Sequence, residues 1–299
     1  MTESGGNGHR DALHFHHSPT RVVSLVPSLT ESMFDLGLGT SLVGITDYCV
    51  RPEEGVDKIP RLGGPKNPRI DDILSLKPDL IITNWEENPP QVVDALRDAG
   101  FPVWVSFPMT VRQSLDVLWT LVGIFRSPSA ATRVETLELT LDWAISSSSQ
   151  RKPLSYFCPI WYGTRDGIHW WMTFNQHTYC YDLLRLLGCH NVFAKRIRNY
   201  PLEADLGLVA AEDPGDRDTR YPCIGLEEIL SLEPDLILLP SEPFAFDEFH
   251  RILLLDLLKS LPAIQLGHIY LVDGTLITWH GTRLAHALRE LPALLDSVQ

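Results

Sequence analysis

One segment of the chain occurs twice, and this repeat constrains the fold more than any other feature of the sequence. Residues 71–82 read DDILSLKPDLII and residues 227–238 read EEILSLEPDLIL. Matching residues keep a constant separation of 156 positions, as the pair Ile73 and Ile229 shows (229 − 73). Two segments this similar at a fixed offset indicate that the chain contains two copies of one structural unit.

Each copy predicts a short helix followed by a buried strand. Acidic residues open each segment and favour a helix N-terminus, while Pro78 and Pro234 stop the helix. The apolar runs at residues 80–82 and 236–239 lack polar alternation, which is typical of parallel strands covered on both faces. The sequence therefore predicts an α/β unit in each half of the chain.

A second pair of segments supports the duplication. Residues 29–37 and 179–188 each predict a helix closed by glycine, followed by strands at residues 42–44 and 191–193. Ser28 and Glu31 have the spacing of a capping box, after a predicted strand at residues 22–26. This role accounts for Ser28 without a nucleophile there. Further predicted strands are at residues 103–105, 154–157 and 269–272.

A long helical stretch separates the copies, because apolar residues recur there at steps of three and four. Pro128 should kink this helix or restart it, with Ser127 as the cap. The simplest α/β architecture has two Rossmann-like lobes with parallel sheets, at residues 21–109 and 151–299. A long interlobe helix over residues 110–150 would join them, with ligand in the crevice between the lobes.

The first 20 residues are rich in Gly, Asn, Ser and His, which is typical of a disordered tail. His14, His16 and His17 of this tail could capture a metal ion, or the tail could be only flexible and polar. No apolar run has the length of a signal peptide or approaches the ~20 residues of a membrane span. As written, the sequence predicts a cytoplasmic protein without membrane insertion, or a periplasmic or extracellular one if the true start differs.

Charge and motifs exclude several classes of function. A formal net charge of −13 argues against nucleic acid, which requires clustered Lys and Arg. The chain has no GxGxxG after the first strand and no GxxxxGK[ST], HExxH or GxSxG motif of nucleotide binding or hydrolysis. Five cysteines without a CxxC pair predict reduced, buried thiols.

Aromatic side chains are concentrated where loops are expected to leave the strands, and seven of them lie between residues 156 and 174. Flat rigid rings on loops suit a wide, partly apolar ligand, which polar neighbours would orient. His280 could ligate a metal of that ligand, or be a capping or surface histidine. The residues expected to contact ligand are Ser28, Tyr48, Trp85, Glu86, Asn88, Phe107, Trp161, Trp171, Phe174, Tyr200, Arg220, Tyr221, Phe244, Trp279 and His280.

Several longer motifs occur together. They are RVVSLVPSLTE at residues 21–31, VGITDYC at 43–49, RLGGPKNPRIDDILSLKPDLI at 61–81, WEEN at 85–88, WWMTFNQHTY at 170–179, RDTRYP at 217–222 and LLPSEPF at 238–244. With these motifs the chain resembles the class III periplasmic-type substrate-binding proteins, which include cobalamin, haem and siderophore receptors. It is most similar to the cobalamin-binding branch, also called helical backbone metal receptors.

This resemblance implies two lobes bridged by a rigid helix and reversible binding of cobalamin or another metal chelate between them. It implies a monomeric protein that serves ABC-type uptake or intracellular handling of the chelate. It also implies that the protein has no catalytic residues, no metal ligands and no intrinsic cofactor. In such receptors an acidic residue near the start of the repeated helix pairs with arginines of the transporter permease. Asp71 and Glu227 hold the matching positions, where acidic residues also favour the helix dipole.

Two other classes of function stay open beside this preferred hypothesis. An intracellular enzyme or cofactor-handling protein could use the same scaffold, because a fold does not fix function. It would need a convergent nucleophile and base, or metal ligands such as His177, Cys180 and His280 close together. Direct binding of a bare transition metal would need several inward-facing His and carboxylate ligands.

Overall fold

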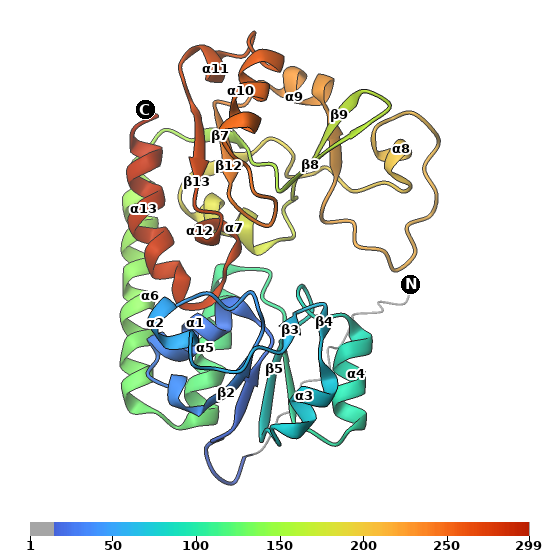
Figure 1. Ribbon diagram of the computed structural model, residues 1–299. Coiled ribbons are helices and arrows are strands. Elements are labelled where there is room, and N and C mark those ends of the chain that lie inside the picture. The colour runs from blue at the N-terminus through green and yellow to red at the C-terminus, as the bar shows by residue number, and fades with distance from the viewer. Residues whose placement is uncertain (1–14, 299) are drawn as a thin grey trace, which may run out of the picture. The chain divides into compact units, whose positions relative to one another are not determined.

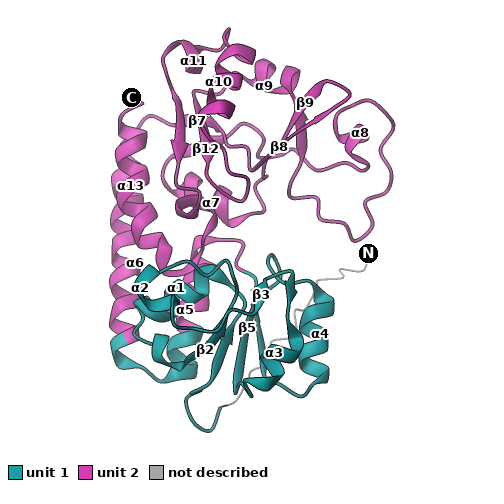
Figure 2. Ribbon diagram, viewed as in Figure 1, with its two compact units in different colours: residues 1–107, 120–129 teal, residues 108–119, 130–299 magenta. Residues whose placement is uncertain are grey.

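The computed structural model describes residues 15–298 and divides into two compact units (Figures 1 and 2). Of the described residues, unit 1 comprises 15–107 and 120–129, and unit 2 comprises 108–119 and 130–298. Each unit contains one four-stranded parallel sheet, so the α/β fold class that the sequence predicts is confirmed. No helix within residues 15–298 combines the length and apolar character that crossing a membrane requires.

The sheet of unit 1 has the strand order β2-β1-β5-β6. Its strands are β1 (Val22–Ser24), β2 (Leu42–Ile45), β5 (Leu80–Asn84) and β6 (Val103–Ser106), and a short hairpin joins β3 (Gly63–Gly64) to β4 (Asn67–Pro68). Its helices are α1 (Pro27–Asp35), η1 (Gly39–Ser41), α2 (Glu53–Val56), α3 (Ile70–Ser75) and α4 (Pro90–Asp98). Ile73 of α3 and Leu96 of α4 pack with Val23 and Ile81, so these two helices cover one face of the sheet.

The sheet of unit 2 has the equivalent order β10-β7-β12-β13, in which the first strand again lies between the second and the third. Its strands are β7 (Leu154–Phe157), β10 (Cys189–Asn191), β12 (Leu236–Pro240) and β13 (Ile269–Val272). Its helices are α7 (Tyr179–Leu186), α8 (Leu202–Asp205), α9 (Leu226–Leu232), α10 (Glu248–Leu257), α11 (Pro262–Gln265), α12 (Thr275–Thr278), η2 (Gly281–Arg283) and α13 (Leu284–Asp296). The shared strand order supports the duplication that the repeat predicts.

Equivalent residues of the two copies are buried in the same way and form the same kind of hydrogen bond. Ile73 and Ile229 are both fully buried under their sheets. The carboxylate of Asp79 accepts main-chain hydrogen bonds from Thr20 (2.8 Å) and Arg21 (2.9 Å) at the entrance to β1. The carboxylate of Asp235 accepts hydrogen bonds from the main chain and hydroxyl of Ser155 in β7. In both copies, the Asp of the Pro-Asp pair therefore fastens the third strand to the first.

Unit 2 contains an additional antiparallel sheet that the sequence patterns did not predict. It has the order β11-β9-β8, from β8 (Trp161–Arg165), β9 (Ile168–Met172) and β11 (Cys223–Gly225). The interpretation of the aromatic segment between residues 156 and 174 as a loop is therefore wrong. Asp166 and Gly167 both have positive φ, 49° and 78°, and form the two-residue turn between β8 and β9.

Two separate helices, α5 (Val111–Phe125) and α6 (Pro128–Ser148), occupy the region of the predicted interlobe helix. Arg126 between them has a left-handed backbone with φ of 51°, which ends the first helix before Pro128 begins the second.

Part of the predicted tail belongs to the folded unit. Ser18 Oγ donates to the carbonyl of Phe125 (2.9 Å), and Arg126 Nη2 donates to the carbonyl of Phe15 (2.8 Å). Residues 15–20 are therefore held against unit 1, which corrects the predicted boundary at residue 20. His14 lies outside the described residues, while His16 and His17 are exposed.

Candidate functional site

The strand ends of unit 1 carry its predicted ligand residues. Tyr48 follows β2, Trp85 follows β5 and Phe107 follows β6. Because the strands are parallel, these segments leave the same edge of the sheet, where ligands of α/β folds usually bind. Tyr48, Trp85 and Phe107 remain 64%, 41% and 36% exposed, which is unusual for such large apolar side chains. Glu86, beside Trp85, is also exposed.

Asn88 is a buried residue that connects the segments at this edge of the sheet through hydrogen bonds to their main chains. Its carboxamide oxygen accepts a hydrogen bond from the Asn84 main chain (2.9 Å), and Nδ2 donates to the carbonyls of Pro65 (2.8 Å) and Leu25 (3.3 Å). The side chain is buried and its polar atoms are engaged by the main chain. Asn88 therefore fastens the Trp85 loop to the end of β1 and to the β3-β4 hairpin, and its contact with ligand stays a prediction.

Ser28 also differs from its predicted role. Helix α1 begins at Pro27, and Val26 is the N-cap residue, with no side-chain cap. The capping box predicted at Ser28 and Glu31 is wrong, because Pro27 suits the first helical position and the helix starts two residues earlier than predicted. Ser28 is buried within the first turn of α1, directly after β1.

In unit 2 the predicted residues divide into an exposed and a buried group. Trp161, at the start of β8, is 46% exposed, and its ring centroid lies 5.5 Å from that of the half-buried Phe244. Trp171 of β9 and Phe174 are 1% and 0% exposed, and Trp171 packs in the core with Ile224. Trp171 and Phe174 are therefore core residues in this structure, and their contact with ligand stays a prediction. Strand alternation turns Trp171 toward the core.

His280 is a buried neutral histidine. It follows α12, beside the buried Trp279, and its ring lies 6.3 Å from the ring of Tyr179, edge to face. Burial lowers the pKa of His280 to about 4, so the imidazole is uncharged at neutral pH. Within residues 15–298, no three or more His, Cys, Asp or Glu side chains are grouped to hold a metal ion, so His177, Cys180 and His280 form no such centre.

The cysteines of the chain are free thiols, and four of the five are buried. Burial raises the pKa of Cys158 well above its ordinary value and raises those of Cys189 and Cys223 to about 12. A buried thiol with a raised pKa stays protonated and is a poor nucleophile.

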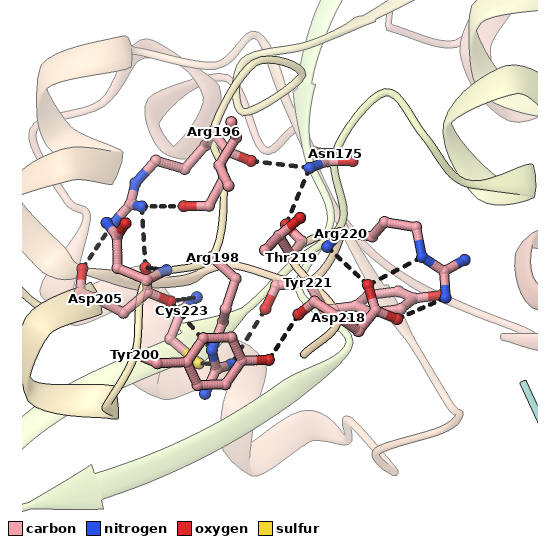
Figure 3. Close-up of polar contacts among 12 residues, drawn as sticks. Asn175, Arg196, Arg198, Tyr200, Asp205, Asp218, Thr219, Arg220, Tyr221 and Cys223 are labelled. Atoms are coloured by element: carbon pink, nitrogen blue, oxygen red, sulfur yellow. Dashed lines mark hydrogen bonds and ion pairs between the residues drawn. The ribbon is translucent and has the colours of Figure 1, made fainter. Parts of the chain in front are cut away.

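Tyr200, Arg220 and Tyr221 lie in the long connection of unit 2 between β10 and β11 (Figure 3). We call residues 199–222 of this connection, which include the short helix α8, the 199–222 loop. The three predicted residues are half-buried. The Tyr200 hydroxyl donates to the carbonyl of Asp218 (2.6 Å), and the carboxylate of Asp218 accepts a hydrogen bond from Arg220 Nε (3.0 Å). The guanidinium of Arg220 lies 5.1 Å from the ring of Tyr221. The structure thus brings these three predicted residues together.

Further polar side chains in and next to this loop were not identified from the sequence. Asp205, at the end of α8, forms ion pairs with Arg196 (2.9 Å) and Arg198 (3.4 Å) and is fully buried. Asn175 Nδ2 donates to the carbonyls of Arg196 (3.1 Å) and Thr219 (3.2 Å), which joins the two sides of the loop. These residue types have no spacing that distinguishes them from surface polar residues, so only the fold reveals them.

The two predicted docking residues occupy equivalent surface positions. Asp71 and Glu227 lie in the first turns of α3 and α9, and both are exposed. In each copy the next acidic residue is instead held by an arginine, as Arg69 pairs with Asp72 (2.6 Å) and Arg196 with Glu228 (3.1 Å). Asp71 and Glu227 are therefore exposed acidic groups at equivalent positions of the two helices.

Known proteins similar to this chain include periplasmic binding proteins. Residues 22–131 match the family described as periplasmic binding protein. The vitamin B12-binding protein of Vibrio cholerae is 25% identical over 280 residues, which cover 93% of this chain and 86% of that protein. The vitamin B12-binding protein of Yersinia pestis is 25% identical over 246 residues, which cover 82% and 78%.

Solved structures show the same fold. The periplasmic vitamin B12 binding protein BtuF of Vibrio cholerae aligns with a TM-score of 0.74 at 22% identity, covering 95% of this chain and 99% of that one. The periplasmic heme-binding protein RhuT from Roseiflexus aligns with a TM-score of 0.71 at 20% identity, covering 93% and 99%. The resemblance to the class III periplasmic-type substrate-binding proteins, predicted from the sequence motifs, is thus confirmed for this chain.

Proposed function

We propose that this protein is a solute-binding protein without enzymatic activity that reversibly binds a large metal chelate. Cobalamin or another corrinoid is the first candidate, because similar proteins bind vitamin B12. Haem is the second candidate, because a protein with the same fold binds it. Siderophores are the third kind of metal chelate that we consider. The chelate would arrive with its own metal, so the protein needs neither a resident cofactor nor metal ligands of its own.

One observation carries this proposal: large aromatic side chains stay exposed at the carboxyl ends of the parallel strands. Tyr48, Trp85 and Phe107 do so in unit 1. In unit 2 the exposed Trp161 begins the antiparallel strand β8, shortly after the parallel strand β7 ends at Phe157. Each such ring exposes apolar area to water and would release that water against a flat macrocycle. Rigid rings also lose little rotamer freedom on binding, which favours them over flexible apolar side chains.

A titration tests the proposal directly. We expect cyanocobalamin to quench the fluorescence of the chain's eight tryptophans with saturation at micromolar concentration, on the order of common small-ligand affinities. Hemin titrated in parallel decides between the two leading candidates. No quenching by cyanocobalamin, hemin or a ferric siderophore at tens of micromolar, as an order of magnitude, would contradict the proposal. Mass spectrometry of the purified protein checks separately for a co-purifying cofactor.

We propose that the protein delivers its ligand to an ABC transporter permease through Asp71 and Glu227. Periplasmic relatives support a place of action in the periplasm or outside the membrane rather than in the cytoplasm. The exposed carboxylates are suited to arginines on a partner, and complementary charge mainly speeds association.

Charge reversal separates docking from ligand binding. We expect Asp71→Lys and Glu227→Lys to reduce uptake of labelled cobalamin by cells about tenfold, while the purified variants bind ligand normally. Asp98→Lys and Asp216→Lys are matched controls, since both positions are exposed acidic residues in the same two units. Equal loss of uptake in the controls would contradict specific docking. Cell fractionation checks the location, and light scattering checks that the protein is a monomer.

A further inference from the structure

The loop at residues 199–222 has both of its ends attached to one carboxylate (Figure 3). Asp205 Oδ1 accepts a hydrogen bond from the main chain of Asn199 (2.9 Å), where the loop begins. Asp205 Oδ2 accepts a hydrogen bond from the main chain of Cys223, where the loop ends and β11 begins. A single buried side chain therefore closes the loop at its base.

Two arginines balance the charge of this carboxylate. Arg196 and Arg198 lie against Asp205, and Arg196 Nε also donates to Glu228 (3.1 Å). Two cations thus face two carboxylates, and the Arg196 guanidinium further donates to the main-chain carbonyl of Asp205 (2.6 Å). Asp205 is the fully buried member of this cluster, whereas Arg196, Arg198 and Glu228 are partly exposed. Removing one partner of a buried ion pair leaves an uncompensated charge and is destabilising, so the paired geometry around Asp205 favours one local conformation.

Arg198, which pairs with Asp205, also contacts predicted ligand residues of the loop. Arg198 Nη1 donates to the carbonyl of Tyr221 (3.1 Å) and to Cys223 Sγ (2.7 Å), and its guanidinium lies 5.2 Å from the ring of Tyr200. Tyr200 in turn holds Asp218, whose carboxylate orients Arg220. Each predicted ligand residue of the loop is therefore one or two contacts away from Asp205 or its arginine.

We propose that Asp205 is a positioning residue, which fixes both ends of the 199–222 loop and thereby places Tyr200, Arg220 and Tyr221 for ligand. The ligand part of this inference rests on the proposed function, whereas the anchoring part does not. Asp205 itself is fully buried and acts only through the groups that it holds. Loss of its charge should loosen the loop before it unfolds the unit.

Cys223 provides a probe of the loop base. Its thiol is fully buried beneath Arg198, so a thiol reagent reaches it only when the base opens. Cys158 in the same unit and Cys49 in unit 1 are equally buried, and they report on wider unfolding. Labelling with iodoacetamide under native conditions, mapped by mass spectrometry, therefore separates local opening from global unfolding.

In Asp205→Asn we expect Cys223 to be labelled about tenfold faster than in the unchanged protein, with Cys158 and Cys49 still protected. Arg198→Lys keeps the charge but loses the planar fork, so it should give the same pattern if Asp205→Asn does not fold. Asp216→Asn is the control, because it removes an equal charge from an exposed position of the same loop. Unchanged Cys223 labelling in both variants, or equal labelling of Cys158, would overturn the anchoring.

Affinity for cyanocobalamin and hemin tests the second half of the inference. Asp205→Asn should weaken binding of whichever probe the unchanged protein binds by about tenfold, while Asp216→Asn should not. Unchanged affinity despite faster Cys223 labelling would overturn the positioning role. If the unchanged protein binds neither probe, the proposed function and the ligand part fail together, and the labelling result still decides the anchoring.

Discussion

Lys77 and Glu233 have the same left-handed backbone, with φ of 46° and 44°, although 156 residues separate them. Each ends the repeated helix directly before a proline, which cannot continue it. A left-handed conformation costs a non-glycine residue roughly 1–2 kcal/mol, so its presence at both positions points to a shared constraint. The aspartate two residues later supplies that constraint, because its carboxylate binds the neighbouring strand in both copies.

This shared turn predicts equal effects of equal substitutions. We expect Asp79→Ala and Asp235→Ala each to lower the free energy of unfolding by about 1–3 kcal/mol, because main-chain donors of the neighbouring strand lose their acceptor. Denaturant unfolding measures the loss. Asp79→Asn and Asp235→Asn retain an acceptor oxygen and should lose less. Alanine variants as stable as the unchanged protein would show that the turn forms without the carboxylates.

The repeat and the apolar runs allowed the core of each unit to be predicted from sequence. Strand β7 agrees with its prediction residue by residue, whereas β10 ends at Asn191, where the predicted strand begins. The β8-β9 hairpin was missed, although Asp166 and Gly167 form an Asp-Gly pair, which is a strong hairpin signal. The aromatic residues on both sides of that pair favour a binding loop when the turn signal is overlooked.

Burial of individual site residues was less predictable, because it depends on contacts between distant segments. Trp161 and Trp171 belong to the same hairpin and carry the same side chain, yet one is exposed and the other is core. Asn88 and Asp205 depend on main-chain groups that only the folded chain brings within reach. Sequence patterns identify strand ends well, but they do not reveal which polar side chains turn inward there.

The two tryptophans of the hairpin provide a matched pair for a second prediction. Trp171→Ala should lower the free energy of unfolding of unit 2 by about 3–5 kcal/mol, because it leaves a cavity in the core. Trp161→Ala should change stability by less than about 1 kcal/mol and weaken ligand binding by about tenfold or more. Denaturant unfolding and cyanocobalamin titration measure the two effects. Full ligand affinity in Trp161→Ala would remove this residue from the site.

The buried histidine predicts a dependence of stability on pH. Unfolded His280 binds a proton near its ordinary pKa of 6.5, whereas burial holds the folded pKa at about 4. Between these values the unfolded chain binds more protons, so the free energy of unfolding falls as the pH falls from 6.5 toward 4, by roughly 3 kcal/mol at most. Above pH 6.5 this contribution is fully present.

His280→Asn should remove that part of the pH dependence, which denaturant unfolding at a series of pH values measures. Asp247 titrates in the same experiment, because its hydrogen bonds from His250 lower its pKa. The comparison is therefore the difference between the variant and the unchanged protein, in which the Asp247 contribution cancels. Parallel curves between pH 4 and 6.5 would mean that His280 titrates normally in the folded state.

Asn88 provides the sharpest test of how the Trp85 loop is held. Asn88→Ala should cost about 2–3 kcal/mol, since the buried Asn84 N–H and Pro65 carbonyl lose their partner. It should also weaken ligand binding, because Trp85 lies on the segment that is released. Denaturant unfolding and cyanocobalamin titration measure the two losses.

Asn88→Asp keeps the shape and the acceptor oxygen but directs carboxylate charge at the carbonyls of Pro65 and Leu25, where the amide donated. Burial beside two acceptors favours the protonated acid, so the folded pKa of the new side chain should rise above its unfolded value. The destabilisation should therefore be large at pH 7 and shrink as the pH falls through the folded pKa, where the acid can donate one hydrogen bond again. Asn67→Asp, at an exposed position of the β3-β4 hairpin, controls for the added charge. A destabilisation independent of pH would show that the Asn88 amide does not act as a donor in the folded protein.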